Sequence, residues 1–191
     1  MAEKNQKKNG ILQSANVLFM EKGFHNTKME EIAVNAGVGK GTLYEYFKNK
    51  QDIIDEVCIE KIAAAREMII EISNKEITFK QKLAEIFKYK RELMHCEDMS
   101  IESILAYKNA ISDDAIKIMM NHVTEMYDFM FKMIEQGKDE GIVTKSLPSE
   151  IIACAVVGTM SEYFRLHLYN DGGINGDDDI FNLFFNGFGV K

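Results

Sequence analysis

The stretch GVGKGTLYEYFKNK, residues 37–50, places three glycines, three lysines and two tyrosines within fourteen positions. Leu43 and Phe47 are four residues apart, so they share one face of a helix. The other face of that helix is polar and carries Lys40, Thr42, Tyr44 and Glu45. The pattern predicts a short helix that buries Leu43 and Phe47, exposes Tyr44 and follows a tight turn at residues 37–39.

Two further helices are predicted upstream of this stretch. The first has its apolar residues at helical spacing and ends at Gly23, since glycine suits the left-handed position after a helix. The second opens with Thr27 and Glu30, a pattern in which each side chain can bond the other residue's backbone N–H, and it ends at Gly37. Two short helices joined by a glycine turn form a helix-turn-helix pattern, whose second helix can enter a DNA major groove.

The charge of the chain is divided unevenly between its two parts. The net charge is −7, but residues 1–50 hold eight lysines and five acidic residues, a balance of +3. The remaining 141 residues hold fifteen basic and twenty-five acidic residues, a balance of −10. A basic head on an acidic body fits a protein in which only the head meets phosphate.

Helical patterns continue through the rest of the chain. A fourth helix begins with Asn49 as its cap and Asp52 as the reciprocal partner, and the chain has one proline and no tryptophan. The sequence therefore predicts an all-α fold with an N-terminal three-helix domain at residues 1–50, its motif at about 28–47, and a larger helical domain at 51–191. The later helices are expected at roughly 78–95 with Thr78 as cap, 98–110, Ser112 to Gly137, Pro148 to Leu168 and Asp178 to Phe188.

Several classes of protein are disfavoured by what the sequence lacks. The three cysteines are far apart and odd in number, which fits reduced thiols in a cytoplasmic protein, and neither a signal peptide nor a membrane span of about 18 apolar residues is present. The four histidines lack a metal-ligand spacing, so no metal and no cofactor are predicted. No enzyme is predicted either, because nucleophile-elbow and Walker motifs are missing, although spacing alone leaves a Ser-His-Asp triad open.

The run from Ala15 to Ile54 resembles the DNA-binding domain of the TetR family of bacterial repressors. The residues that carry the resemblance are Gly23-Phe24, Thr27, Ile32-Ala33, Ala36-Gly37-Val38, Lys40-Gly41-Thr42-Leu43-Tyr44, Tyr46-Phe47 and Lys50. The resemblance implies an all-helical homodimer in which three N-terminal helices bind an operator, a fourth leads to a ligand-binding body, and the last two long helices form the dimer interface. It implies a ligand-responsive regulator, a repressor that a small molecule releases from a palindromic operator.

The resemblance also implies which residues contact DNA. Lys40, Thr42 and Tyr44 are expected on the recognition helix against the DNA, while Thr27, Tyr46 and Lys50 are expected at flanking phosphates. Gly39 and Gly41 let backbone N–H groups approach the phosphates. Family members often carry serine or threonine at the position of Gly39, so this chain lacks a hydroxyl contact there and offers only its backbone N–H. The alternative reading of each lysine is a solvated surface charge.

Methionines and aromatic residues of the body suggest a cavity for an apolar or amphipathic small molecule, because methionine fills irregular apolar cavities and adaptable binding surfaces. Tyr107 and Tyr127 are expected to orient the ligand through their hydroxyls. For any single residue the alternative is ordinary core packing. The residues expected at this cavity are Phe87, Met94, Met99, Tyr107, Met120, Met126, Tyr127 and Met130.

Small residues and phenylalanines near the C-terminus suggest the dimer interface, with burial inside the monomer as the alternative. The residues expected there are Ala155, Gly158, Thr159, Phe164, Phe181, Phe184 and Phe185. A second hypothesis for the whole chain is a small-molecule-binding or protein-interaction module of the same fold that lost operator binding. The lysines and tyrosines retained at 40–50 argue against that hypothesis.

Overall fold

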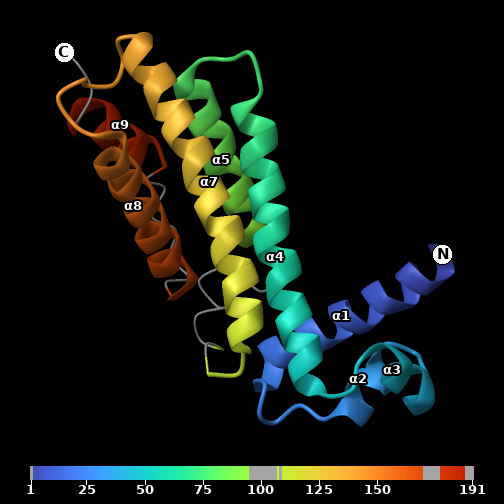
Figure 1. The fold of residues 1–191 in the computed structure, drawn as a ribbon. Coiled ribbons are helices and arrows are strands. Elements are labelled where there is room, and N and C mark those ends of the chain that lie inside the picture. Colours follow the sequence, from blue (N-terminus) through green and yellow to red (C-terminus); the bar gives the residue numbers. More distant parts are fainter. Residues whose placement is uncertain (1, 95–106, 108, 170–176, 188–191) are drawn as a thin grey trace. The chain divides into compact units, whose positions relative to one another are not determined.

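The structure is a computed structural model that describes residues 2–94, 107, 109–169 and 177–187 (Figure 1). The elements of this part of the chain are helices, which confirms the all-α class. The helix expected at 98–110 lies largely outside the described residues. The others are α1 (Ala2–Lys22), α2 (Met29–Asn35), α3 (Lys40–Tyr46), α4 (Lys50–Ser73), α5 (Phe79–Met94), α7 (Asp113–Asp139), α8 (Ser149–Tyr169) and α9 (Asp177–Gly187).

The chain divides into two compact units. Unit 1 comprises residues 1–64 and 97–122, and unit 2 comprises residues 65–96 and 123–191. Helices α4 and α7 each contribute residues to both units. The first turns of α4 supply part of the core of unit 1, so this unit extends beyond residue 50. The functional domain boundary expected at residue 50 stays a prediction.

Unit 1 is built on α1, with α1 packed on α2 and α2 packed on α3. Leu43 and Phe47 are both buried, as predicted from their spacing. Helices of seven residues such as α2 and α3 are too short to be stable alone in water, so burial of these side chains holds them. The core of the unit consists chiefly of Ile11, Ala15, Phe19, Ile32, Ala33, Leu43, Phe47, Ile53, Ile54, Val57 and Cys58.

The segment before α7 is fastened to the rest of unit 1 by polar contacts. The Tyr107 hydroxyl donates a hydrogen bond to the Phe19 carbonyl at 2.7 Å, and the Ser112 backbone N–H donates to the Asp55 carboxylate at 2.9 Å. Gln51 donates to the Ala110 carbonyl. The start of α7 is thus bonded to the end of α1 and to the first turns of α4.

Most of the predicted helix starts are confirmed. The Asn49 side chain accepts a hydrogen bond from the Asp52 backbone N–H at 3.0 Å. The Asp52 carboxylate in turn accepts from the backbone N–H of Lys48, not of Asn49. Thr78 and Gln81 form a reciprocal capping pair at the start of α5. Pro148 lies one residue before α8 and its carbonyl accepts the first helical bonds, so it occupies the cap rather than the first helical position.

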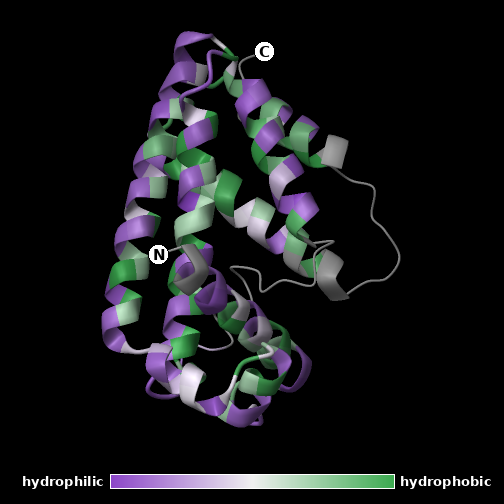
Figure 2. Ribbon diagram, turned by 90° about the vertical axis from the view of Figure 1, so that its right-hand side faces the viewer, coloured by the Kyte–Doolittle hydropathy of each residue, from purple (hydrophilic) through white to green (hydrophobic). Residues whose placement is uncertain are grey.

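Unit 2 is held by a cluster of phenylalanine rings from α5, α8 and α9. The ring of Phe87 lies 5.9 Å from Phe164, 4.8 Å from Phe181 and 5.9 Å from Phe184, measured between centroids. Methionines and isoleucines of α4 and α7 complete the same core. Figure 2 shows apolar and polar residues interspersed along the helices, as expected for helices with one buried and one exposed face.

Candidate nucleic-acid interface

The turn between α2 and α3 is set by Gly37. Its φ of +65° lies in the left-handed region, where glycine is favoured because it has no Cβ. The Gly37 N–H bonds to the Val34 carbonyl at 3.1 Å, and the Val38 N–H bonds to the Ala33 carbonyl at 3.0 Å. These bonds satisfy carbonyls at the end of α2 in the manner of a Schellman motif, and they fix the angle at which the chain enters α3.

Helix α3 presents the polar face that the sequence predicts. The Lys40 side chain is 62% exposed and Tyr44 is 43% exposed. Gly39 and Gly41 are exposed as well, whereas Thr42 and Tyr46 are half-buried. The structure therefore gathers Gly39, Lys40, Gly41 and Tyr44 on exposed positions of one short helix and its cap.

Gly39 is the N-cap of α3, with φ −68° and ψ 150°. This conformation is open to any residue, and a Cβ built there meets no atom within 4 Å. A serine or threonine would therefore fit without strain. Glycine at this position is not required by the fold, and the structure gives no other reason for it.

Thr27 lies differently from the expectation of a phosphate contact. It is 2% exposed, and its hydroxyl lies 2.9 Å from the Gly23 carbonyl and 3.2 Å from the Leu18 carbonyl. The hydroxyl therefore caps carbonyl groups at and just after the C-terminal end of α1. The cap of α2 also shifts by one residue, because the Glu31 carboxylate accepts from the Lys28 backbone N–H at 2.7 Å. The predicted Thr27–Glu30 pair is thus replaced by Lys28 and Glu31.

Lys50 is also occupied within unit 1. Its ammonium group donates to the carbonyls of Phe24 and Thr27, the latter at 2.8 Å, and lies 4.4 Å from the centroid of the Phe24 ring. A third carbonyl, that of His25, lies 3.2 Å away. Desolvation lowers the pKa of Lys50 from its ordinary value. Lys50 thus ties the first turn of α4 to the loop between α1 and α2.

Two acidic residues within the motif form ion pairs that the sequence pattern does not reveal. Glu30 contacts Lys40 at 2.7 Å, and Glu31 contacts Lys22 at 2.7 Å. The hydrogen bonds from these lysines lower the pKa of each carboxyl group. Their spacing of ten and nine residues from their partners is not a helical spacing, so only the tertiary arrangement brings them together.

The residues expected at a ligand cavity are divided between the two units. Met130 and Phe87 are buried in the core of unit 2, and Met126 and Tyr127 pack against that core. Met120 belongs to unit 1 and is 56% exposed. Tyr107 also belongs to unit 1, where its hydroxyl donates a hydrogen bond to the Phe19 carbonyl. Met99 and the side chain of Met94 lie outside the described part of the chain.

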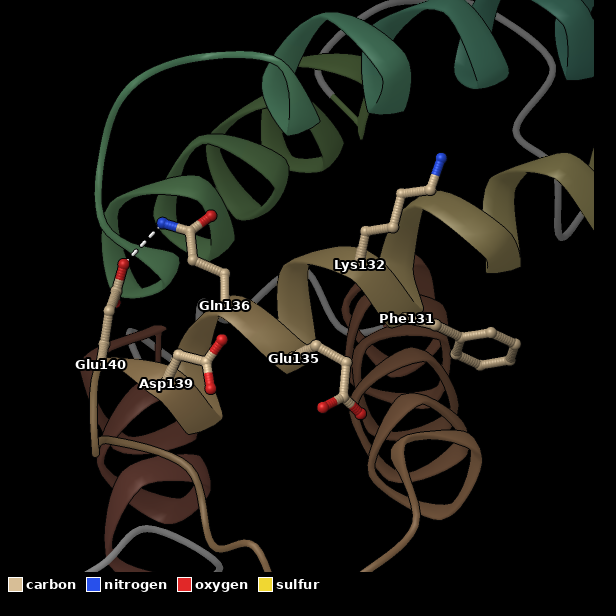
Figure 3. A pocket seen from close by; sticks show the side chains of 6 residues that line it. All are labelled: Phe131, Lys132, Glu135, Gln136, Asp139 and Glu140. Atoms are coloured by element: carbon tan, nitrogen blue, oxygen red, sulfur yellow. Dashed lines mark hydrogen bonds between the residues drawn. The ribbon is translucent and has the colours of Figure 1, made fainter.

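Two surface hollows lie on unit 2. One, of about 680 Å³, is lined by residues of α7 and its C-terminal end (Figure 3). There Gln136 donates to Glu140 at 2.5 Å. The other, of about 470 Å³, is lined by residues between Lys75 and Lys82 together with Gln136 and Glu140. None of the residues expected at the ligand cavity lines either hollow.

The residues expected at a dimer interface fall into two groups. Phe164 and Phe184 are buried within unit 2, and Phe181 and Phe185 are half-buried against the same core, so the monomer itself covers most of their area. Ala155 and Gly158 are exposed on α8, and Thr159 is half-buried. The exposed Ile151, Cys154, Ala155, Gly158 and Leu166 follow helical spacing, and Leu183 of α9 is also exposed.

Two kinds of feature that would suggest other functions are missing from the described residues. None of the helices in this part of the chain is long and apolar enough to cross a membrane. Among the same residues, no group of three or more histidine, cysteine or acidic side chains is placed to hold a metal ion.

Comparison with known proteins identifies relatives of the chain. Residues 11–57 match the model of the tetR family of bacterial regulatory proteins. The HTH-type transcriptional regulator YvkB of Bacillus subtilis is 31% identical over 164 residues, which is 83% of this chain and 82% of that protein. The fatty acid metabolism regulator protein of B. subtilis is 26% identical over 172 residues, 90% of this chain and 88% of that protein.

A solved structure also resembles the chain. The transcriptional regulator FadR of B. subtilis, in complex with stearoyl-CoA, superposes with a TM-score of 0.77 at 23% identity. The match covers 94% of this chain and 98% of that one. At this identity the likeness shows a common fold.

The placement of Lys50 predicts that its ammonium group stabilises the loop at residues 24–27. Lys50→Met keeps the apolar stem but leaves the carbonyls of Phe24 and Thr27 without their charged donor. We expect the free energy of unfolding to fall by roughly 1–2 kcal/mol and the amides of this loop to exchange faster with solvent. Denaturant titration and hydrogen exchange measure both. Lys48→Met, at an exposed position two residues away, is the control, and equal effects of the two substitutions would contradict the assignment.

Proposed function

This chain belongs to the TetR family of bacterial regulatory proteins and is a transcriptional regulator, and from that premise we propose that it is a repressor released from its operator by a small molecule. The observation that carries the proposal is α3 itself. Leu43 of α3 and its C-cap residue Phe47 are buried, and the free face of the helix presents Lys40 and Tyr44 directly after the glycine turn. The relatives found are regulators rather than enzymes.

We propose that α3 enters the major groove of DNA. Lys40 can neutralise phosphate or reach a guanine edge, and Thr42 offers a hydroxyl and a methyl group to backbone and base. Tyr44 and Tyr46 can donate their hydroxyls to phosphate oxygens, while Gly39 and Gly41 leave room for backbone N–H groups to approach them. We propose that Thr27 acts indirectly, because its hydroxyl holds the α1–α2 loop that precedes the motif. Lys50 holds the same loop, and we retain it as a proposed contact of a flanking phosphate.

We propose that two copies bind a roughly palindromic operator in the cytoplasm. A two-fold dimer sets its recognition helices into successive major grooves about 34 Å apart. The exposed stripe of α8 supports this proposal, because small residues such as Ala155 and Gly158 let a second helix approach closely. Leu183 of α9 adds exposed apolar area. Of the seven residues expected at the interface, Phe164 and Phe184 contribute chiefly to the monomer core.

We propose that the ligand is apolar or amphipathic, with a long-chain acyl group as the first candidate. Two findings support this proposal. The fatty acid metabolism regulator of B. subtilis is 26% identical over 90% of this chain, and a protein of the same fold binds stearoyl-CoA. The methionine and aromatic side chains of unit 2, among them Met126, Tyr127 and Met130, provide adaptable apolar surface. Residues 51–191 act as the ligand-binding and dimerisation domain in this proposal, and residues 1–50 act as the DNA-binding domain.

The ligand acts by discriminating between two conformations. It must bind better to the conformation with the wrong spacing of recognition helices, since a ligand with equal affinity for both shifts nothing. We propose α4 as the link, because it contributes residues to both compact units.

Substitution of the exposed face tests the recognition helix. An operator is first selected by the purified protein from genomic DNA fragments, and affinity is then measured by fluorescence anisotropy at several salt concentrations. Lys40→Ala combined with Tyr44→Ala should weaken binding about tenfold to hundredfold and leave thermal unfolding nearly unchanged, because both side chains are exposed. Lys117→Ala on α7 is the control. Unchanged affinity would instead favour a module of this fold that no longer binds DNA.

The length of the acyl chain tests the ligand class. A long-chain acyl-CoA should weaken operator binding by about tenfold or more, whereas free CoA and a short-chain acyl-CoA should have little effect, because they lack the apolar area that drives burial. The measurement is operator anisotropy against ligand concentration. Equal effects of all three compounds would exclude recognition of the acyl chain.

Gly158 tests the dimer interface without disturbing the monomer. It is exposed on α8, and a Cβ built there meets no atom within 4 Å. Gly158→Arg should therefore leave the helical content unchanged and shift the protein to monomer, because only a second copy can clash with the new side chain. Analytical ultracentrifugation measures the change. Lys88→Arg, on an exposed position of α5, is the control, and a variant that remains dimeric would place the interface elsewhere.

A further inference from the structure

The exposed cation of the recognition helix is held by a carboxylate from the preceding helix. The Lys40 ammonium lies 2.7 Å from Glu30 Oε1, and the side chains are 62% and 55% exposed. The same ammonium lies 5.9 Å from the centroid of the Tyr44 ring. In the DNA-free protein, the charge best placed to meet phosphate is therefore paired with a negative charge of the same unit.

Glu30 is not needed to start α2, because its neighbour performs that task. Glu31 accepts from the Lys28 backbone N–H and contacts Lys22, both at 2.7 Å. Glu30 lies in the first turn of α2, where a negative charge gains only a modest dipole stabilisation. The carboxylate of Glu30 can thus be neutralised without removing the cap of the helix.

The pair changes what DNA gains from Lys40. Sequence-independent binding depends on neutralising phosphates with free cations, and a lysine already paired with a carboxylate brings no net charge. When DNA binds, either the Glu30 carboxylate separates from Lys40, or it stays paired and places a negative charge close to the DNA phosphates. An exposed ion pair contributes about 0–1 kcal/mol, which is small enough to be displaced and large enough to alter affinity.

We propose that Glu30 is a specificity-determining residue that acts through Lys40, by holding its ammonium away from phosphates unless the DNA offers a base-edge contact in return. This inference rests on the proposed function, in which α3 enters a major groove. Glu30 is a positioning residue in this arrangement and needs no contact of its own with a base. A contact of lysine with a guanine edge offsets the loss of the carboxylate, whereas contact with a phosphate alone offsets less of it.

The test is a double-substitution cycle read on two DNA duplexes. The wild type, Glu30→Gln, Lys40→Met and the double variant are titrated with the selected operator and with a scrambled duplex of equal length, at three salt concentrations. Glu30→Gln should tighten binding to the scrambled duplex roughly two- to fivefold and to the operator by less. The salt dependence of the scrambled complex should steepen by about 0.9 for each further phosphate that the protein neutralises. In the Lys40→Met background, Glu30→Gln should have no effect.

Glu45→Gln is the matched control, since it removes the same charge from an exposed position on α3 itself. Its effect should be the same with and without Lys40→Met. If Glu30→Gln also acts equally in both backgrounds, Glu30 is only a general negative charge and the inference is overturned; it is also overturned if binding to the scrambled duplex does not change. Failure of the wild type to bind any selected duplex would overturn the proposed function as well, which separates the two failures.

Discussion

A helix of seven residues is not stable alone in water. The free-energy cost of nucleating it exceeds the stabilisation that the hydrogen bonds of two turns provide. Helix α3 exists because Leu43 and Phe47 are buried against the rest of unit 1. The same burial fixes the rotation of the helix, and so decides that Lys40 and Tyr44 face outward. Everything proposed about DNA depends on this constraint, since side chains on a mobile segment could not be held in register with a groove.

The fold could be predicted largely because its signals are local. The spacing of Leu43 and Phe47, the glycine turn at Gly37 and the caps at Asn49 and Thr78 depend on residues within four positions of one another, and the structure confirms each of them. The sequence pattern places the start of α2 one residue early. Two adjacent glutamates make either register possible from sequence. The Thr27 hydroxyl donates instead to the carbonyls of Leu18 in α1 and of Gly23 just after it, which leaves Lys28 as the cap.

The candidate site was less predictable, because the positions of its side chains depend on hydrogen bonds and ion pairs with residues distant in sequence. A lysine at the start of a helix gives no sign that carbonyls 23 to 26 residues earlier converge on it, as they do on Lys50. Tyr107 likewise bonds a carbonyl 88 residues away. Lys8, Lys22 and Lys40 are all paired with carboxylates. Glu56 lies outside residues 1–50, so its pairing with Lys8 leaves this segment with less free positive charge than its balance of +3. The other two pairs are already counted in that balance.

The interleaving of unit 1 with later parts of the chain has a consequence for engineering. Ile53, Ile54 and Val57 of α4 belong to its core, and Ala110 and Ile111, which precede α7, are buried as well. A fragment cut after residue 50 would leave the apolar surface beneath α1 and α3 open to water, and a chimera joined there would have to recreate it. Residues 1–50 of this protein therefore cannot be transferred alone as a folded DNA-binding domain. Exchange of DNA specificity between relatives is better made by replacing the outward side chains of α3 within the intact chain.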